Sequence, residues 1–383
     1  LKIYIFIFRN LGQSILNFSC SGGFPFIPFC SKATIPTVPC PSGSLLTLTK
    51  FKISVAAASN KYPDALKNRS IIEDLGGSFN ARVTENDTTY YITARKDHFT
   101  KLMDLIGNAY VNFYIDESII PQERNAVIEE LNTYNSETWT NFDEKILKFL
   151  FPNNPMTSTN SESIENMKYL TTKSLYDFKN KYYSSDNTVI TVAGGVPVGK
   201  MKKEAEKFIS KVKKTDAPKL KKTPLKKLDG PSVVFVKTPE ADTYNIKIVF
   251  RHNYSFETKE ANVLEMICNV LTKGLSSRLM EILRGKEGLV YRCKAQVSNN
   301  PYFKEMGLFM IETNTDRKNV AKVINIIISE LKKMKSKLIS KKEHERALEM
   351  HKTAMCMTDT DKSPDKFAEK YTECVLYQKP VET

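Results

Sequence analysis

Acidic residues are missing from the first 63 positions of this 383-residue chain, although the whole chain contains 43 of them. Neither the two-residue period of strands nor the 3.6-residue period of helices persists through residues 1–58. A transit peptide is acid-poor and rich in serine, whereas a mistranslated upstream region would be foreign to the protein altogether. The pattern favours the second interpretation, and we expect residues 1–58 to be non-native or disordered.

Long apolar runs and paired cysteines are also absent. No stretch of about 18 consecutive apolar residues occurs, so the sequence predicts no membrane span. The chain has seven cysteines. None forms a Cys-x-x-Cys pair, and their spacing matches no zinc pattern. Buried free thiols in a reducing intracellular compartment, with the mitochondrial matrix as one option, are therefore the expected state.

Positive charge is abundant, with a net charge of +14. Lysines are densest in Lys200–Lys227, where a nucleic-acid or anionic-membrane patch is one interpretation. A solvated helix followed by a charged linker is the other. The run lacks the repeated aromatic residues that stack on bases, so we favour the second interpretation and expect no nucleic-acid partner.

From Ser59 onward, helical and strand patterns alternate as in an α+β protein. Residues 59–214 contain a helix, a Thr/Tyr-rich hairpin and several amphipathic helices, ending in a strand and the lysine-rich helix. A Lys/Pro linker follows at 215–231. Residues 232–383 then repeat a similar order, starting with a strand at 232–238. We therefore predict two similar halves, each a mostly antiparallel sheet with helices packed on one face.

Four motifs give the chain a specific resemblance. They are "NKYPDALKNRSIIEDLGGSFNARVTENDTTYY", "IPQERNAVIEELNTY", "YYSSDNTVITVAGGV" and "LTKGLSSRLMEILRGKEGLVYRCKA". In this order they resemble the insulinase/pitrilysin family of zinc metallopeptidases, the inverzincins, from about Ser59 to the end. The resemblance implies a clamshell chamber for peptides. It also implies an incomplete N-terminal-type domain at 59–214 and a truncated C-terminal-type domain at 232–383.

The family's chemistry rests on a helical His-x-x-Glu-His. Its two histidines bind zinc and its glutamate is the general base. A glutamate on a later helix is the third ligand, and a supporting glutamate precedes it by two helical turns. The resemblance puts Glu130 on the third-ligand position and Glu123 on the supporting one.

The His-x-x-Glu-His itself is absent. Counting back from "NKYPD" puts Thr49 and Ile53 where the two histidines belong and Lys52 where the base belongs. Four histidines lie elsewhere, and we expect ordinary surface positions for them: His98, His252, His344 and His351. With one retained carboxylate ligand the chain should neither bind catalytic zinc nor hydrolyse peptides.

Other matched residues concern the substrate. Asn80 and Ala81 match the edge strand on which the family docks extended peptide through main-chain hydrogen bonds. Arg284 and Tyr291 match a pair that contacts the scissile carbonyl and can stabilise its developing charge. Without the resemblance, these would be an ordinary edge strand, a helix-end cation and a strand-face aromatic.

Three functions stay open at this point. A gene-model fault could have removed the motif from a zinc endopeptidase that cleaves peptides or unfolded segments, and the sharp boundary near Ser59 favours this origin. Alternatively, the chain is a natural non-catalytic homologue that binds peptides or pairs with a family member as a homo- or heterodimer. An electrostatic binding protein that uses Lys200–Lys227 is the third.

Overall fold

The computed structural model describes two compact units of an α+β protein. One comprises Leu1–Val234 with Thr360–Thr383, and the other Phe235–Asp359. No helix in the described part of the chain is long and apolar enough to cross a membrane. The residues described are 2–8, 15–19, 58–83, 87–136, 138–152, 154, 157–215, 228, 230–236, 243–254, 258–299, 306–357, 368 and 371–372.

The first unit is built on a five-stranded sheet in the order β2-β5-β1-β4-β3. Its strands are β1 (Lys2–Phe8), β2 (Ile15–Ser19), β3 (Ser78–Val83), β4 (Asp87–Thr93) and β5 (Thr188–Ala193). Strands β2 and β5 pair in parallel, and the other neighbours are antiparallel. Among the described strands β3 pairs with β4 alone, so it forms an edge of this sheet.

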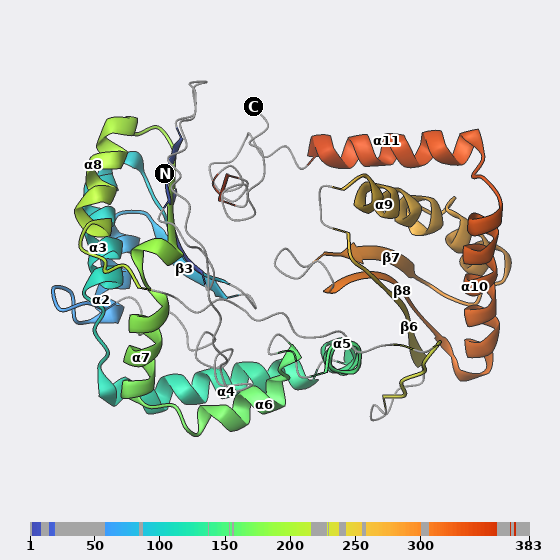
Figure 1. The fold of residues 1–383 in the computed structure, drawn as a ribbon, viewed down its shortest axis with the longest axis horizontal. Coiled ribbons are helices and arrows are strands. Elements are labelled where there is room, and N and C mark those ends of the chain that lie inside the picture. Colours follow the sequence, from blue (N-terminus) through green and yellow to red (C-terminus); the bar gives the residue numbers. More distant parts are fainter. Residues whose placement is uncertain are drawn as a thin grey trace. The chain divides into compact units, whose positions relative to one another are not determined.

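One face of this sheet is covered by three helices (Figure 1). They are α2 (Ala65–Asp74), α3 (Phe99–Val111) and α8 (Val198–Ile209). Their apolar faces close a core with β4 and β5 that includes Ile92, Leu102, Val192 and Met201. Burial of this apolar surface is the main force holding helices and sheet together.

The structure corrects the expectation that residues 1–58 contain no regular structure. Lys2–Phe8 lies between β4 and β5, with Ile5 opposite both Tyr90 and Ile190. Its β-branched and aromatic residues have high strand propensity, which outweighs the weak pattern around them. Residues 20–57, with Thr49, Lys52 and Ile53, lie outside the described residues, and the interpretation of the segment as non-native stays a prediction.

A separate helical layer belongs to the same unit. It comprises α4 (Ile120–Ser136), α5 (Thr138–Leu150), α6 (Asn160–Met167) and α7 (Thr172–Tyr182). Its apolar cluster is distinct from the sheet core and consists of Ile115, Ile120, Val127, Leu131, Met167, Leu170 and Leu175. The sequence predicted α4 and α7 but not α5 and α6.

The second unit has a three-stranded antiparallel sheet in the order β6-β8-β7. The strands are β6 (Thr243–His252), β7 (Cys293–Ser298) and β8 (Gly307–Asp316). Helices α9 (Lys259–Thr272), α10 (Val320–Ser336) and α11 (Lys341–Met357) accompany a π-helix at Met280–Lys286. Ile311, Leu283 and Ile327 are in its core. Short 3-10 helices in the two units are Lys96–His98, Glu117–Ile119, Ser185–Asn187 and Arg317–Asn319.

The prediction of a strand at 232–238 is wrong for residues 232–236, the part of this range that the structure describes. Residues 231–236 form no strand, and Val233 and Phe235 are 76% and 92% exposed. Their apolar alternation resembles a strand pattern, but strand propensity reflects packing against neighbouring side chains. Such packing is lacking for these two side chains.

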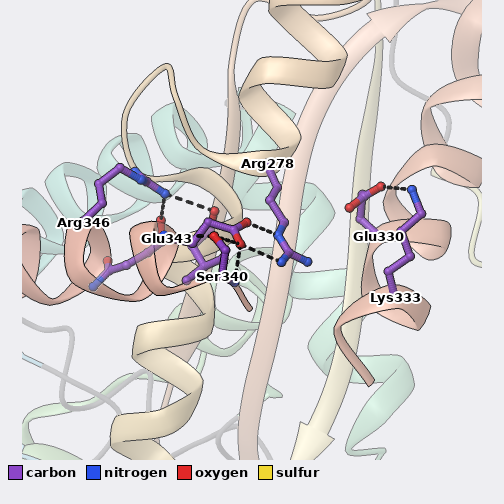
Figure 2. A network of polar contacts seen from close by, with 8 residues as sticks. Arg278, Glu330, Lys333, Ser340, Glu343 and Arg346 are labelled. Atoms are coloured by element: carbon purple, nitrogen blue, oxygen red, sulfur yellow. Dashed lines mark hydrogen bonds and ion pairs between the residues drawn. The ribbon is translucent and has the colours of Figure 1, made fainter. Parts of the chain in front are cut away.

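Two arginines fasten α11 to the rest of the second unit (Figure 2). Arg278 forms a two-pronged ion pair with Glu343 in the first turn of α11, with Nη2 to Oε2 at 3.0 Å. Arg346 donates to the carbonyl of Lys273 at 2.6 Å, just beyond α9. A bidentate guanidinium–carboxylate pair fixes geometry as well as charge, so α11 has a defined position on α9.

Candidate functional site

Helix α4 carries the two glutamates that the sequence singled out. Pro121 stands in its first turn, where a missing N–H costs nothing. Val127 and Leu131 are buried in the helical layer and set the rotation of the helix. Glu123 and Glu130 are both half-buried, and their seven-residue spacing places them along one side of α4.

Two further side chains of α4 that the sequence analysis missed form hydrogen bonds beside these glutamates. Tyr134 donates its hydroxyl to Glu130 Oε1 at 3.1 Å, one turn further along α4. Arg124 Nη2 donates to the carbonyl of Leu170 at 2.8 Å and ties α4 to the segment after α6. The i, i+4 spacing of Glu130 and Tyr134 was the available signal. The bond from Arg124 spans 46 residues and leaves no local pattern.

The donor set does not fit the family's zinc site. Within the described residues no group of three or more His, Cys, Asp or Glu side chains could hold a metal ion. Glu123 and Glu130 contribute two carboxylates, whereas a catalytic zinc takes three protein ligands, among which histidine is common. The sequence contains no His-x-x-Glu-His to complete them. We therefore derive no chemical step through zinc for this chain.

The edge strand β3 presents Asn80 and Ala81. Asn80 is exposed, and its Oδ1 accepts a hydrogen bond from the Ala81 N–H at 2.8 Å. The Ala81 N–H is thus satisfied by its own neighbour rather than by β4, so it faces the open side of the sheet. Successive residues of a strand point their N–H and C=O groups to opposite sides. Phe79, Ala81 and Val83 therefore share that side, which no other described strand covers. They offer main-chain partners for a further strand, which at Ala81 would replace the Asn80 side chain as the acceptor.

A layer of tyrosines backs the strands next to this edge. Tyr90 and Tyr183 join their hydroxyls at 2.9 Å, and Tyr110 stacks on Tyr183 with ring centroids 5.8 Å apart. With Phe79 and Arg69 they line a small apolar cavity. Burial raises the pKa of Tyr90 to about 12, so its hydroxyl stays neutral.

In the second unit Arg284 and Tyr291 lie together. The Arg284 guanidinium sits over the Tyr291 ring, 4.6 Å from its centroid, in a cation–π contact. Tyr291 is 78% exposed. Leu283 and Val290, each next to one member of the pair, are buried. Apolar anchors thus hold the backbone while the charged and aromatic groups face solvent.

Two other histidines and two cysteines can be placed in their surroundings. His344 is exposed, as predicted, but His252 is not an ordinary surface histidine. Its Nε2 is buried and has no hydrogen-bond partner among the residues that the structure describes. Its ring covers Gly307, and burial lowers its pKa. Cys268 and Cys293 are buried free thiols, as predicted, and burial raises the pKa of each to about 12.

Comparison with known proteins gives two matches to one peptidase family. The family described as "Insulinase (Peptidase family M16)" matches residues 55–161, and "Peptidase M16 inactive domain" matches residues 169–350. These matches cover most of the stretch, from about Ser59 onward, in which the four motifs were recognised. They account for both the hairpin with its edge strand and the segment that carries Arg284 and Tyr291.

Individual relatives are more distant. The chain is 25% identical over 306 residues to the mitochondrial-processing peptidase subunit beta of Saccharomyces cerevisiae, covering 75% of this chain and 64% of that protein. An uncharacterized zinc protease of Rickettsia bellii is 23% identical, covering 72% of this chain and 65% of that protein. The chain thus spans slightly less than two thirds of the length of these relatives.

Solved structures share the fold. A protease from Helicobacter pylori superposes with a TM-score of 0.76 at 15% identity, covering 98% of this chain and 84% of that one. A peptidase M16 inactive domain from Pseudomonas fluorescens gives a TM-score of 0.71 at 14% identity, covering 99% and 83%. At these identities the likeness concerns the fold alone.

Proposed function

The chain belongs to the insulinase (M16) peptidase family. On that premise we propose that it binds peptides or unfolded protein segments along β3 without hydrolysing them. The observation that carries this proposal is the side of β3 that no other described strand covers. An extended peptide added there gains main-chain hydrogen bonds that are independent of its side chains. Such a site accepts varied sequences, as a protein that acts on unfolded segments requires.

The lack of hydrolysis follows from the residues at the family's catalytic positions. Thr49, Lys52 and Ile53 supply neither the two imidazoles nor the carboxylate base. Glu130 and Glu123 then serve as surface carboxylates of α4. The enclosing chamber, and the contact of Arg284 and Tyr291 with a bound peptide, stay predictions of the resemblance.

Replacing Ala81 by proline tests the site. Proline removes a central N–H on the open side and leaves the bonds to β4 in place, because proline is tolerated on the outer side of an edge strand. We expect Ala81→Pro to weaken binding of a fluorescent unfolded peptide by about ten-fold or more, measured by polarisation, since main-chain docking needs that donor. Ala81→Ser keeps the N–H and is the matched control. Equal affinity of the proline variant would disprove docking on β3.

A second family member is the proposed partner. The yeast relative is by name a subunit, which supports a heterodimer for this chain, and a homodimer is the alternative. Sedimentation of the purified chain, alone and after co-expression with a catalytically complete homologue, tests this proposal. A monomer in both experiments would contradict it.

The origin of the missing motif has two explanations. Retention of Glu123, Glu130, Arg284 and Tyr291 supports a gene-model fault in a zinc endopeptidase, because a long-inactive homologue need not keep them. A natural loss would leave Thr49, Lys52 and Ile53 in the transcript. Sequencing the transcript across the codons for residues 40–64 separates the two, since the first explanation requires His-x-x-Glu-His directly ahead of "SNKYPD".

A further inference from the structure

The turn between α10 and α11 concentrates positive charge around an exposed leucine. Figure 1 shows α10 turning into α11 at an outer corner of the second unit. Leu338, in this turn, is 92% exposed. We call residues 332–342 the lysine–leucine turn; its six lysines are all exposed, and they are Lys332, Lys333, Lys335, Lys337, Lys341 and Lys342.

Most of this charge is not neutralised by neighbouring carboxylates. Lys333 pairs with Glu330 at 2.6 Å and Lys341 with Glu345 at 3.8 Å. Glu343 is engaged by Arg278. The other four lysines, Lys332, Lys335, Lys337 and Lys342, form no ion pair with a carboxylate in the part of the chain that the structure describes.

Helix stability does not account for this arrangement. Lysines at the C-terminal end of α10 interact favourably with its dipole. Lys341 and Lys342, however, occupy the first turn of α11, where the positive end of the dipole disfavours cations. The ion pair with Glu345 offsets part of this cost for Lys341. Lys342 has no such pair among the described residues, which points to a role outside the fold.

Hydrogen bonds at the end of α10 and at the start of α11 fix the backbone of the lysine–leucine turn. The Lys337 N–H donates to the Lys333 carbonyl at 2.8 Å and closes α10. Ser340 and Glu343 form reciprocal bonds at the start of α11, with Ser340 N–H to Glu343 Oε2 at 2.8 Å and Glu343 N–H to Ser340 Oγ at 3.3 Å. Arg278 fixes Glu343 in turn (Figure 2). Leu338 is thus presented to solvent by a braced turn.

We propose that the lysine–leucine turn docks on the surface of an anionic phospholipid bilayer. Lysines near such a surface are attracted by its negative potential, and each increases binding about five-fold. A leucine at the apex adds apolar surface that can enter the headgroup–acyl boundary. A nucleic acid offers no apolar phase for Leu338, and this turn has no aromatic residue or arginine to stack on bases.

The lysines of α8 provide an internal comparison. Lys200, Lys203, Lys211 and Lys214 are also exposed, but they lie on or just after a helix that also carries Glu204 and Glu206. No large apolar residue at the end of α8 near Lys211 and Lys214 is exposed among the described residues. Reversing four charges at either place changes the net charge of the chain equally. A comparison of the two variants therefore separates the effect of the lysine–leucine turn from the effect of net charge.

Vesicle binding of the full chain tests the proposal. The probe is a sedimentable vesicle of phosphatidylcholine with about 30% phosphatidylserine, against pure phosphatidylcholine, at low salt. Four Lys→Glu replacements at Lys332, Lys335, Lys337 and Lys342 should reduce binding to the anionic vesicle more than about 100-fold. The same replacement at Lys200, Lys203, Lys211 and Lys214 should reduce it less than about ten-fold.

Entry of the Leu338 side chain into the bilayer can be followed by fluorescence. Because Leu338 is almost fully exposed, Leu338→Trp should not disturb the fold. On anionic vesicles its fluorescence should shift to the blue and be quenched by brominated lipid, relative to the parent chain with its single Trp139. Leu338→Asp should weaken vesicle binding at least about ten-fold.

Three outcomes would overturn the proposal. They are equal binding to neutral and anionic vesicles, equal losses from the two sets of charge reversals, and vesicle binding of the Leu338→Trp chain without any change in the fluorescence of the introduced indole. Salt-sensitive binding of a single-stranded oligonucleotide that only the turn's charge reversals abolish would instead assign the turn to nucleic acid.

Discussion

The two units use different means to position the residues that the resemblance matches to the family's site. In the first unit Glu123 and Glu130 belong to α4, whose apolar cluster is separate from the sheet core. In the second unit Leu283 and Val290, beside Arg284 and Tyr291, are part of the sheet core itself. The carboxylate helix is therefore an attached layer, whereas the Arg284–Tyr291 pair is fixed by the core.

This difference indicates which half tolerates loss of chemistry. Helix α4 packs on its own apolar cluster rather than on the sheet core. We therefore expect α4 to keep its position when a zinc ligand or the segment before Ser59 is changed. Residues joined directly to a core cannot move without affecting the stability of the whole unit. The backbone that carries Arg284 and Tyr291 is thus held by the buried Leu283 and Val290, whereas both side chains of the pair face solvent.

The largest effect on stability is expected from truncating a buried leucine in either core. Leu102 and Leu283 are both fully buried, one in each unit. Leu102→Ala and Leu283→Ala should each lower the free energy of unfolding by about 2–5 kcal/mol. Because the units have separate cores, we expect each variant to shift a different transition in urea unfolding followed by unit-specific hydrogen exchange. A shift of both transitions together by either variant would show one cooperative core.

A smaller effect concerns close packing in the first unit. A Cβ on Gly107 of α3 would lie 2.3 Å from Phe208 Cγ of α8. Gly107→Ala should therefore cost about 1–3 kcal/mol through overpacking, although alanine is the better helix former. Gly199, in α8, has open space around its Cβ position, and Gly199→Ala is the control, with a gain of up to about 1 kcal/mol. Thermal unfolding of the two variants compares them, and a stabilised Gly107→Ala chain would contradict the packing described.

The smallest effect depends on pH in the second unit. The hydrogen bond from Arg278 holds the pKa of Glu343 low, at about 2. A lowered carboxyl pKa stabilises the fold above the unfolded value of about 4.3, and this contribution is lost as the pH falls toward about 2. Glu343→Gln should destabilise the unit by about 1–2 kcal/mol at pH 7. The difference from the parent chain should shrink below about pH 4 in urea titrations, and a pH-independent difference would show that the ion pair is not its source.

Local patterns predicted most of the elements that carry the candidate site. Pro121 and the spacing of Val127 and Leu131 indicate α4, which the structure places at Ile120–Ser136. The alternation in Ser78–Val83 and the Thr/Tyr-rich stretch Asp87–Thr93 indicate the β3–β4 hairpin. These elements were predictable because their signals lie within one or two turns or strands.

Features that depend on distant partners were not predictable. The π-helix at Met280–Lys286 has the composition of an ordinary helix, and no local pattern indicates its altered bonding. Arg278 and Glu343 pair across 65 residues. A strand was predicted at 232–238, and none forms at the described residues 232–236. None was predicted at Lys2–Phe8, which forms a strand between β4 and β5.

Binding and cleavage of one peptide by the full chain test the central claim most directly. The probe is an unfolded peptide with a fluorophore and quencher at its ends, mixed with the chain in the presence of zinc or of a chelator. We predict saturable binding that is the same in both conditions, weakened by Ala81→Pro, with no release of quenching. Peptide cleavage that the chelator abolishes would contradict the account.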